Sequence, residues 1–206
     1  MPPSIQVVST AAESRSTRLD GFKVLGAMVA LMWASEIVDT VAGHRLDGYG
    51  IEPRDDDGLI GIAAAPFLHA GFGHLISNTV PLLMMGFAIA FAGARRVVAV
   101  TVIVALASGL GTWLVASEGT VHIGASGVVF GYATYLLSRG VFNRDLLELG
   151  IGALVAVVWG GALLGGLLPE EGISWQGHLF GALGGVLAAR LLARDRHAPR
   201  PSSRPG

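Results

Sequence analysis

The sequence predicts an all-α membrane protein, a six-transmembrane-helix bundle, and three observations lead to this fold class. Of the 206 residues, 52% are hydrophobic and only 14% are charged, and the mean hydropathy is +0.60. The apolar residues gather into long runs separated by short polar breaks, and a bilayer core needs about 20 apolar residues per helix. Cysteine does not occur, which excludes disulfides, thiol nucleophiles and thiolate metal sites.

The chain begins with a polar segment and a first predicted span. Residues 1–21 are rich in Ser, Thr and Arg and lack the apolar core of a cleavable signal peptide, so we expect a disordered cytoplasmic tail. The first span, residues 22–42, contains Glu36 and Asp39 on one helical face. Charges inside a span face a bundle interior, a cavity or the interface. We expect a structural or interfacial role for this pair in preference to a catalytic one.

A polar loop, residues 44–61, follows the first span and contains Asp55-Asp56-Asp57. Three adjacent carboxylates suggest a cation site, but the spacing of an EF-hand loop is missing, so a solvated loop is favoured. Residues 58–72 are apolar without a dominant period and are broken at Pro66. This pattern is consistent with a segment lying in the membrane interface.

Five further spans complete the predicted membrane domain of residues 22–192. They cover residues 74–93, 97–117, 126–138, 146–168 and 177–192. The fourth is short, so we expect other helices to surround it and to shield it from lipid. Residues 193–206 are basic and proline-rich, and we expect them to form a disordered cytoplasmic tail.

The distribution of basic residues predicts the orientation. In a six-span arrangement, all of the 14 Lys and Arg residues except Arg45 and Arg54 fall on the side of the termini, and basic residues favour the cytoplasmic side. Both termini of this multi-pass chain are therefore predicted to be cytoplasmic. His74, Ser126 and His178 then lie at a similar shallow depth below the outer surface. The Arg-, Ala- and Gly-rich composition is compatible with a bacterial source, for which the location would be the cytoplasmic membrane.

Ser126 lies between glycines where a polar loop becomes an apolar run. A serine hydroxyl is a weak nucleophile until a base takes its proton, and histidine is the commonest base. His178 heads the sixth span, and both spans carry small residues at four-residue spacing, which lets helix backbones approach in lipid. We therefore expect Ser126 and His178 to meet. The small residues are Gly127 and Gly131 in the fourth span, and Gly181, Ala182, Gly185 and Ala189 in the sixth.

His74 and Asn78 are four residues apart and share a helix face. With the backbone N–H of Ser126 at a helix start, they offer three donors for an oxyanion, and losing one such donor costs about a hundred- to a thousandfold in rate. The other interpretation is that the pair only joins helices by hydrogen bonds. For the pair alone, both interpretations stay open.

Three motifs together resemble the rhomboid intramembrane serine proteases, over residues 22–192. They occur in the order of that family on the second, fourth and sixth predicted spans: Phe67-Leu68-His69 through His74-Leu75-Ile76-Ser77-Asn78, Gly124-Ala125-Ser126-Gly127, and Gly177-His178 with Gly181 and Gly185. The resemblance implies a serine–histidine dyad in a water-filled cavity open to the outside. It also implies cleavage of transmembrane or juxtamembrane segments of other membrane proteins through an acyl-enzyme.

Carried over by residue, the resemblance implies that Ser126 is the nucleophile and His178 the general base. It implies that His74 and Asn78 stabilise the oxyanion and that His69 organises the first loop and retains water. The supporting residues are Phe130, in the place of an aromatic residue that packs on the catalytic histidine, and Gly124, Gly127, Gly181 and Gly185.

The chain also departs from the family pattern. The Trp-Arg pair of many members is missing from the first loop, where Pro53-Arg54 is the nearest basic feature, and this leaves the loop's conformation open. No carboxylate is evident as a third member, which is consistent with a dyad. His122, four residues before Ser126, is expected to be a histidine of the loop surface.

No cofactor and no metal are expected, nor is a nucleic-acid partner. The expected partners are the lipid bilayer and membrane-protein substrates with a transmembrane segment, and the oligomeric state stays open. One alternative is a catalytically inactive rhomboid-like protein that binds membrane segments. Another is a small transporter with Glu36 and Asp39 in its pathway, but the sequence shows no internal repeat.

Overall fold

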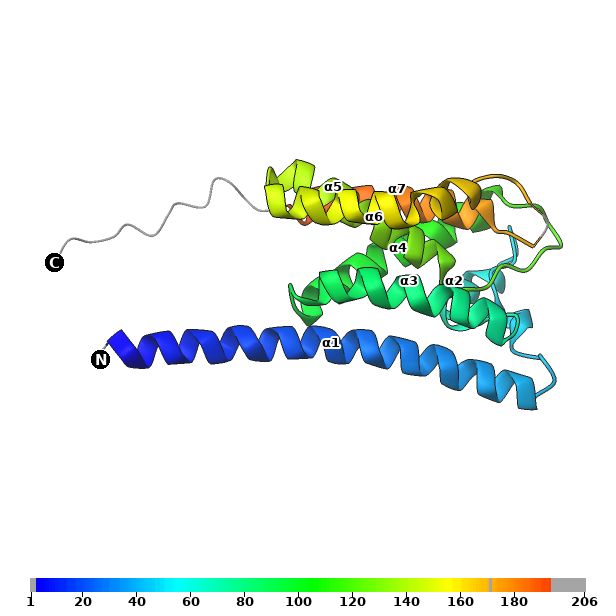
Figure 1. Ribbon diagram of the computed structural model, residues 1–206. Coiled ribbons are helices and arrows are strands. Elements are labelled where there is room, and N and C mark those ends of the chain that lie inside the picture. The colour runs from blue at the N-terminus through cyan, green and yellow to red at the C-terminus, as the bar shows by residue number, and fades with distance from the viewer. Residues whose placement is uncertain (1–2, 171, 194–206) are drawn as a thin grey trace.

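The computed structural model is built from helices (Figure 1) and describes residues 3–170 and 172–193. Nearly all of the expected C-terminal tail, residues 193–206, lies outside the described residues. The elements in chain order are α1 (Pro3–Val41), η1 (Asp47–Tyr49), α2 (Gly58–Ala64), η2 (Ala65–Phe67), α3 (Phe72–Ala90), α4 (Ala94–Val115), α5 (Ser126–Asn143), α6 (Leu146–Gly165) and α7 (Trp175–Leu191), where η marks a short 3₁₀ turn.

Helix α1 is much longer than the predicted first span. The sequence led us to expect disorder over residues 1–21, but the structure continues the helix back to Pro3. Residues 4–20 contain neither glycine nor proline, so nothing interrupts the hydrogen-bonded ladder as it leaves the apolar span. Polarity alone therefore did not decide the backbone conformation of this segment.

Four helices are long and apolar enough to cross a membrane: α3, α4, α6 and residues 15–41 of α1. The chain is thus a multi-pass membrane protein. Helices α5 and α7 coincide with the predicted fourth and sixth spans but fall short of that length or hydropathy. Both bury much of their length inside the bundle, where a less apolar sequence is tolerated because protein, and not lipid, surrounds the helix.

The core lies where α5 packs directly against α7 and α4. Methyl groups added at Gly181 and Gly185 of α7 would meet the backbone carbonyls of Gly127 and Gly131 in α5, so the two helices touch through their backbones. The Thr134 hydroxyl of α5 adds a hydrogen bond of 2.7 Å to the Ala182 carbonyl. This contact fixes the relative position of the first turns of α5 and α7.

The N-terminal ends of α3, α5 and α7 lie at one end of the molecule, together with the loops that lead into them (Figure 1). Helix α1 packs on α3 and α4, while α6 packs on α5. The first loop folds into η1, α2 and η2, and its Ile51 forms an isolated antiparallel bridge with His122. This end of the bundle collects the candidate site residues.

Candidate active site

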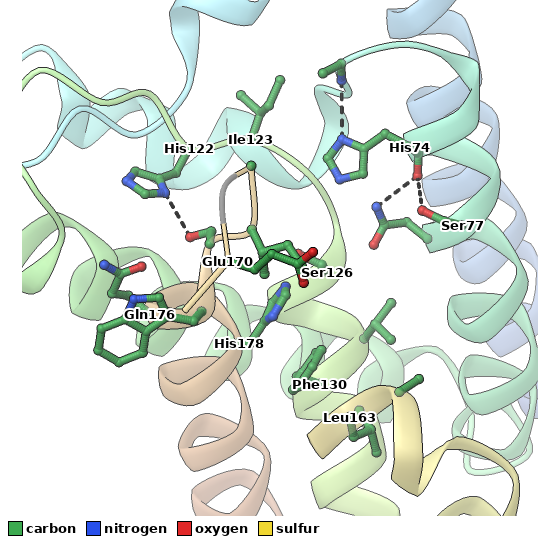
Figure 2. Close-up of a pocket in the computed structure, with 18 of the residues that line it drawn as sticks. His74, Ser77, His122, Ile123, Ser126, Phe130, Leu163, Glu170, Gln176 and His178 are labelled. Carbon is green, nitrogen blue, oxygen red and sulfur yellow. Dashed lines mark hydrogen bonds between the residues drawn. The ribbon is translucent and has the colours of Figure 1, made fainter. Parts of the chain in front are cut away.

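A cavity of about 910 Å³ opens among the first turns of α3, α5 and α7 (Figure 2). Five of the residues predicted to form the site line it, from three separate helices: His74, Asn78, Ser126, Phe130 and His178. The end of α6 and the loop between α6 and α7 complete the wall. His74 and His178, which are far apart in the chain, thus share one polar cavity.

Ser126 is the first residue of α5, and the chain reaches it through Gly124. Gly124 has a φ of +114°, which favours glycine, and a methyl group built there would come within 2.7 Å of His74 Nε2. The Gly124 amide donates a 2.8 Å hydrogen bond to the Ala65 carbonyl. The loop therefore brings the start of α5 against α3, and the first amides of α5 have no partner within the helix.

The His178 ring is held on two sides. Its Nδ1 lies 2.6 Å from the Gly166 carbonyl oxygen; since a carbonyl only accepts, Nδ1 carries the proton and Nε2 has the free lone pair. The Phe130 ring stacks on the imidazole with centroids 4.1 Å apart and planes 6° from parallel. No hydrogen bond joins Ser126 to His178 in the described residues. In enzymes such a catalytic hydrogen bond often forms only when substrate binds.

His74 has the opposite tautomer. Its Nδ1 accepts a hydrogen bond of 3.3 Å from the Ala70 amide, so Nε2 carries the proton and is a donor. Asn78 donates a 3.0 Å bond to the His74 carbonyl through Nδ2, which leaves its second amide hydrogen available. Both donors lie close to Gly124, two residues before Ser126.

His69 lies behind the cavity wall and does not line it. The side chain is 1% exposed, its Nε2 accepts a 3.4 Å hydrogen bond from the Ala125 amide, and its ring centroid is 5.1 Å from that of His74. Burial, and then the neighbouring His74, lower the pKa of His69 to about 4. A neutral His69 therefore supports the chain just before Ser126.

His122 is half-buried, whereas the sequence suggested a surface position. Its Nδ1 lies 2.8 Å from the Ser174 hydroxyl and its Nε2 lies 2.9 Å from the Thr120 hydroxyl. Burial lowers the pKa of His122. Ser174 directly precedes α7, so this histidine joins the loop before α5 to the loop before α7.

Two partners of the site were missed from the sequence. Gly166 acts through its carbonyl oxygen, and a backbone atom leaves no signature in the residue type. Ser174 offers a weak signal, as a serine one residue before a helix is a common cap, although it caps no backbone amide here. In the packing behind the site, the Ser108 hydroxyl donates a 2.8 Å hydrogen bond to the Gly177 carbonyl, at a position where the small residues Ser108 and Gly109 suggested close helix packing.

Comparisons with known proteins point to one family. A family model for the rhomboid domain matches residues 57–195. An uncharacterized protein of Mycobacterium tuberculosis is 43% identical over 206 residues, covering 96% of this chain and 86% of its own length. An uncharacterized protein of Mycobacterium leprae is 43% identical over 181 residues, covering 84% and 71%. The Bacillus subtilis protein "Putative rhomboid protease YdcA" is 28% identical over 176 residues, covering 85% and 83%.

Proposed function

The chain belongs to the rhomboid family, and from this premise we propose that it is an intramembrane serine endopeptidase with Ser126 as nucleophile and His178 as general base. Its substrates are transmembrane or juxtamembrane segments of other membrane proteins. The reaction passes through an acyl-enzyme on Ser126 and uses no cofactor. His74 and Asn78 supply the oxyanion donors.

The observation that carries this proposal is the hydrogen bond between His178 Nδ1 and the Gly166 carbonyl. A general base needs a free lone pair, and this bond gives the lone pair to Nε2. The Phe130 ring fixes the plane of the imidazole, so Nε2 is available on a cavity wall that Ser126 shares.

In the proposed acylation step, the Ser126 hydroxyl rotates toward His178 Nε2 and attacks the scissile carbonyl carbon while its proton passes to Nε2. The oxyanion accepts hydrogen bonds from His74 Nε2, the Asn78 amide and the Ser126 backbone N–H. Collapse of the intermediate breaks the C–N bond, and the imidazolium returns the proton to the leaving amine. Water, deprotonated by His178, then releases the acyl group.

The proposal includes a topology. We propose that α5 and α7 also cross the bilayer, which gives six spans within residues 22–192, and that both ends of the chain are cytoplasmic. Residues 1–21 and 193–206 are then cytoplasmic segments, and the protein lies in the cell membrane. The cavity opens toward the outer side, from which water reaches Ser126.

The test is cleavage of a single-span model substrate in liposomes, with labelling by a phosphonate probe that modifies activated serines. Ser126→Ala should abolish both cleavage and labelling, and His178→Ala should reduce each by a thousandfold or more. Ser117→Ala is the matched control, because Ser117 lines the same cavity but is no part of the proposed machinery. It should cleave and label like the unmodified protein.

Retention of cleavage by Ser126→Ala would show that the nucleophile is wrong. A folded, unmodified protein that neither cleaves nor labels would instead favour the inactive, segment-binding alternative. Equal loss in Ser117→Ala would show that the assay reports folding and not catalysis.

A further inference from the structure

A second group of polar side chains lies outside the candidate active site, at the end of α1 and in the loop after it. Asp39 belongs to the last turn of α1, His44 follows the helix, and Asp47 begins η1. One ligand atom from each of the three lies within 4.8 Å of the others. His44 Nδ1 is 3.4 Å from Asp39 Oδ2 and 3.9 Å from Asp47 Oδ2.

Glu36, one helical turn before Asp39, adds an independent observation. Its side chain is 1% exposed, and neither carboxylate oxygen has a hydrogen-bond partner among the described residues. The charges nearest to Glu36 include those of Asp47, Asp39 and His44, although its carboxylate lies outside the set of ligand atoms within 4.8 Å of one another. A carboxylate that stays charged when it is buried is paired with a cation or coordinates a metal.

The other two carboxylates are also incompletely satisfied. Asp39 Oδ2 and Asp47 Oδ1 are buried and accept no hydrogen bond from the described part of the chain. No Lys or Arg side chain within residues 3–170 and 172–193 forms a recorded ion pair with any of the three carboxylates. Two carboxylates thus lie beside one histidine, with the buried Glu36 one helical turn away, and none of the three has a Lys or Arg partner in the described part of the chain.

The local backbone holds the group together. His44 has a φ of 60°, a conformation that costs a non-glycine residue free energy, and its amide donates a 2.9 Å hydrogen bond to the Asp39 carbonyl. The Leu46 amide donates a 2.6 Å bond to Asp39 Oδ1. This bond fixes one oxygen of Asp39 and leaves Oδ2 facing His44.

We propose that Asp39, His44 and Asp47 bind a divalent transition-metal cation, with Zn²⁺ as the best chemical match and the buried Glu36 carboxylate as a neighbouring negative charge. Zinc is bound tetrahedrally by imidazole nitrogen and carboxylate oxygen at about 2.0–2.2 Å, which places ligand atoms about 3.4 Å apart, close to the observed 3.4 Å and 3.9 Å. The imidazole favours zinc over Ca²⁺ or Mg²⁺, which take oxygen ligands. The His44 side chain is 53% exposed and gives the ion access from solvent.

The site links two segments, the end of α1 and the first loop. Glu36 and Asp39 belong to α1, His44 and Asp47 belong to the first loop, and the Glu36 carboxylate also lies near the backbone amide of Gly71, which precedes α3. A bound ion therefore holds the end of α1 to the first loop. Its removal is expected to lower the stability of this end of the bundle.

The test uses the full chain in detergent micelles, freed of any affinity tag, stripped with EDTA and returned to Zn²⁺. After desalting, elemental analysis should find about one zinc per chain, and saturating Zn²⁺ should raise the midpoint of thermal unfolding by roughly 5–10 °C. Asp47→Asn and His44→Gln should each weaken zinc binding by about tenfold or more. Asp56→Asn, which removes an exposed carboxylate from the same loop, should bind as the unmodified chain does.

Two further outcomes decide the proposal. An unmodified chain that neither retains zinc nor gains stability overturns it, and the carboxylates are then held by shared protons. Stabilisation by Ca²⁺ but not by Zn²⁺ overturns the transition-metal assignment. If Asp47→Asn does not fold, the comparison of zinc binding by His44→Gln with zinc binding by Asp56→Asn is sufficient for the decision. Ser126→Ala should bind zinc normally, so the result is independent of the proposed protease activity.

Discussion

Helices α6 and α7 are neighbours along the chain and both are rich in glycine, but in α6 only Gly152 lies against another backbone, whereas α7 packs on its neighbours through all four of its glycines. A methyl group added at Gly181 or Gly185 of α7 would meet the backbone of α5. A methyl group at Gly160, Gly161 or Gly165 of α6 would meet nothing within 4 Å. A glycine in a helix therefore indicates close helix packing only where the backbone of another helix lies opposite it.

The two helices also contribute differently to the candidate site. Helix α7 supplies the His178 side chain from a buried face, whereas α6 exposes most of its apolar side chains and supplies a backbone carbonyl just beyond its last turn. The closely packed pair α5 and α7 thus supports the imidazole, and the more exposed helix α6 orients it. The two contributions meet at Gly166.

The largest expected effect is that of Gly181→Ala in the tight helix. The added methyl group overlaps the Gly127 carbonyl, so α7 must move away from α5. We expect a loss of about 3 kcal/mol in the free energy of unfolding, seen as a fall of roughly 10 °C in the thermal midpoint in detergent. An unchanged midpoint would show that the α5–α7 contact is looser than described.

Gly166→Ala tests the contact between the end of α6 and the His178 ring of α7. Its backbone angles suit alanine, but the methyl group would press on the Phe130 ring and on His178 Nδ1. We expect kcat/KM for a model substrate to fall roughly tenfold to a hundredfold through misplacement of the imidazole, with the thermal midpoint nearly unchanged. Gly165→Ala, its open neighbour, is the control and should keep full activity.

Phe130→Leu tests the stacking surface that α5 offers to α7. Aromatic stacking contributes about 0.5–1.5 kcal/mol beyond burial, so kcat/KM should fall by roughly two- to tenfold. The control is Phe87→Leu, because the Phe87 ring is 53% exposed and contacts only other phenylalanine rings among the recorded aromatic pairs. Equal losses in both variants would contradict a specific role for stacking on His178.

The smallest expected effect is a gain, from Gly160→Ala in the open helix. Alanine is favoured over glycine in a helix interior by about 0.5–1 kcal/mol, and nothing in the described structure opposes the methyl group. The thermal midpoint should rise by a few degrees at most, with activity unchanged. A clear loss of stability would show that this face of α6 has a protein partner, such as a second copy of the chain.

The helices of the bundle could be predicted because lipid imposes long apolar runs. Helices α3, α4 and α6 begin within three residues of the predicted spans, and α5 begins at Ser126 as predicted. The end of α5 was not predictable, since the helix continues through polar residues to Asn143 by packing on α6. The helical start of α1 was missed for a related reason, because polarity was taken as a sign of disorder.

Only those parts of the candidate site that are formed by side chains could be predicted from the sequence. The sequence placed Ser126, His74 and His178 at a common depth, and the structure gathers them in one cavity. Their roles stay predictions. The link between His122 and Ser174 and the turn that brings His44 back to Asp39 depend on loop conformation, which spacing along the chain does not encode.

The Gly166 carbonyl also bears on how this protein can vary over evolution. An orienting aspartate or asparagine can be lost by one codon change, but a main-chain oxygen is present whatever residue occupies the position. Selection can therefore act there only on size and on the path of the chain. Drift at this position should favour the smallest residues, and inactivation should arise by displacement of the α6 terminus and not by deletion of a functional group.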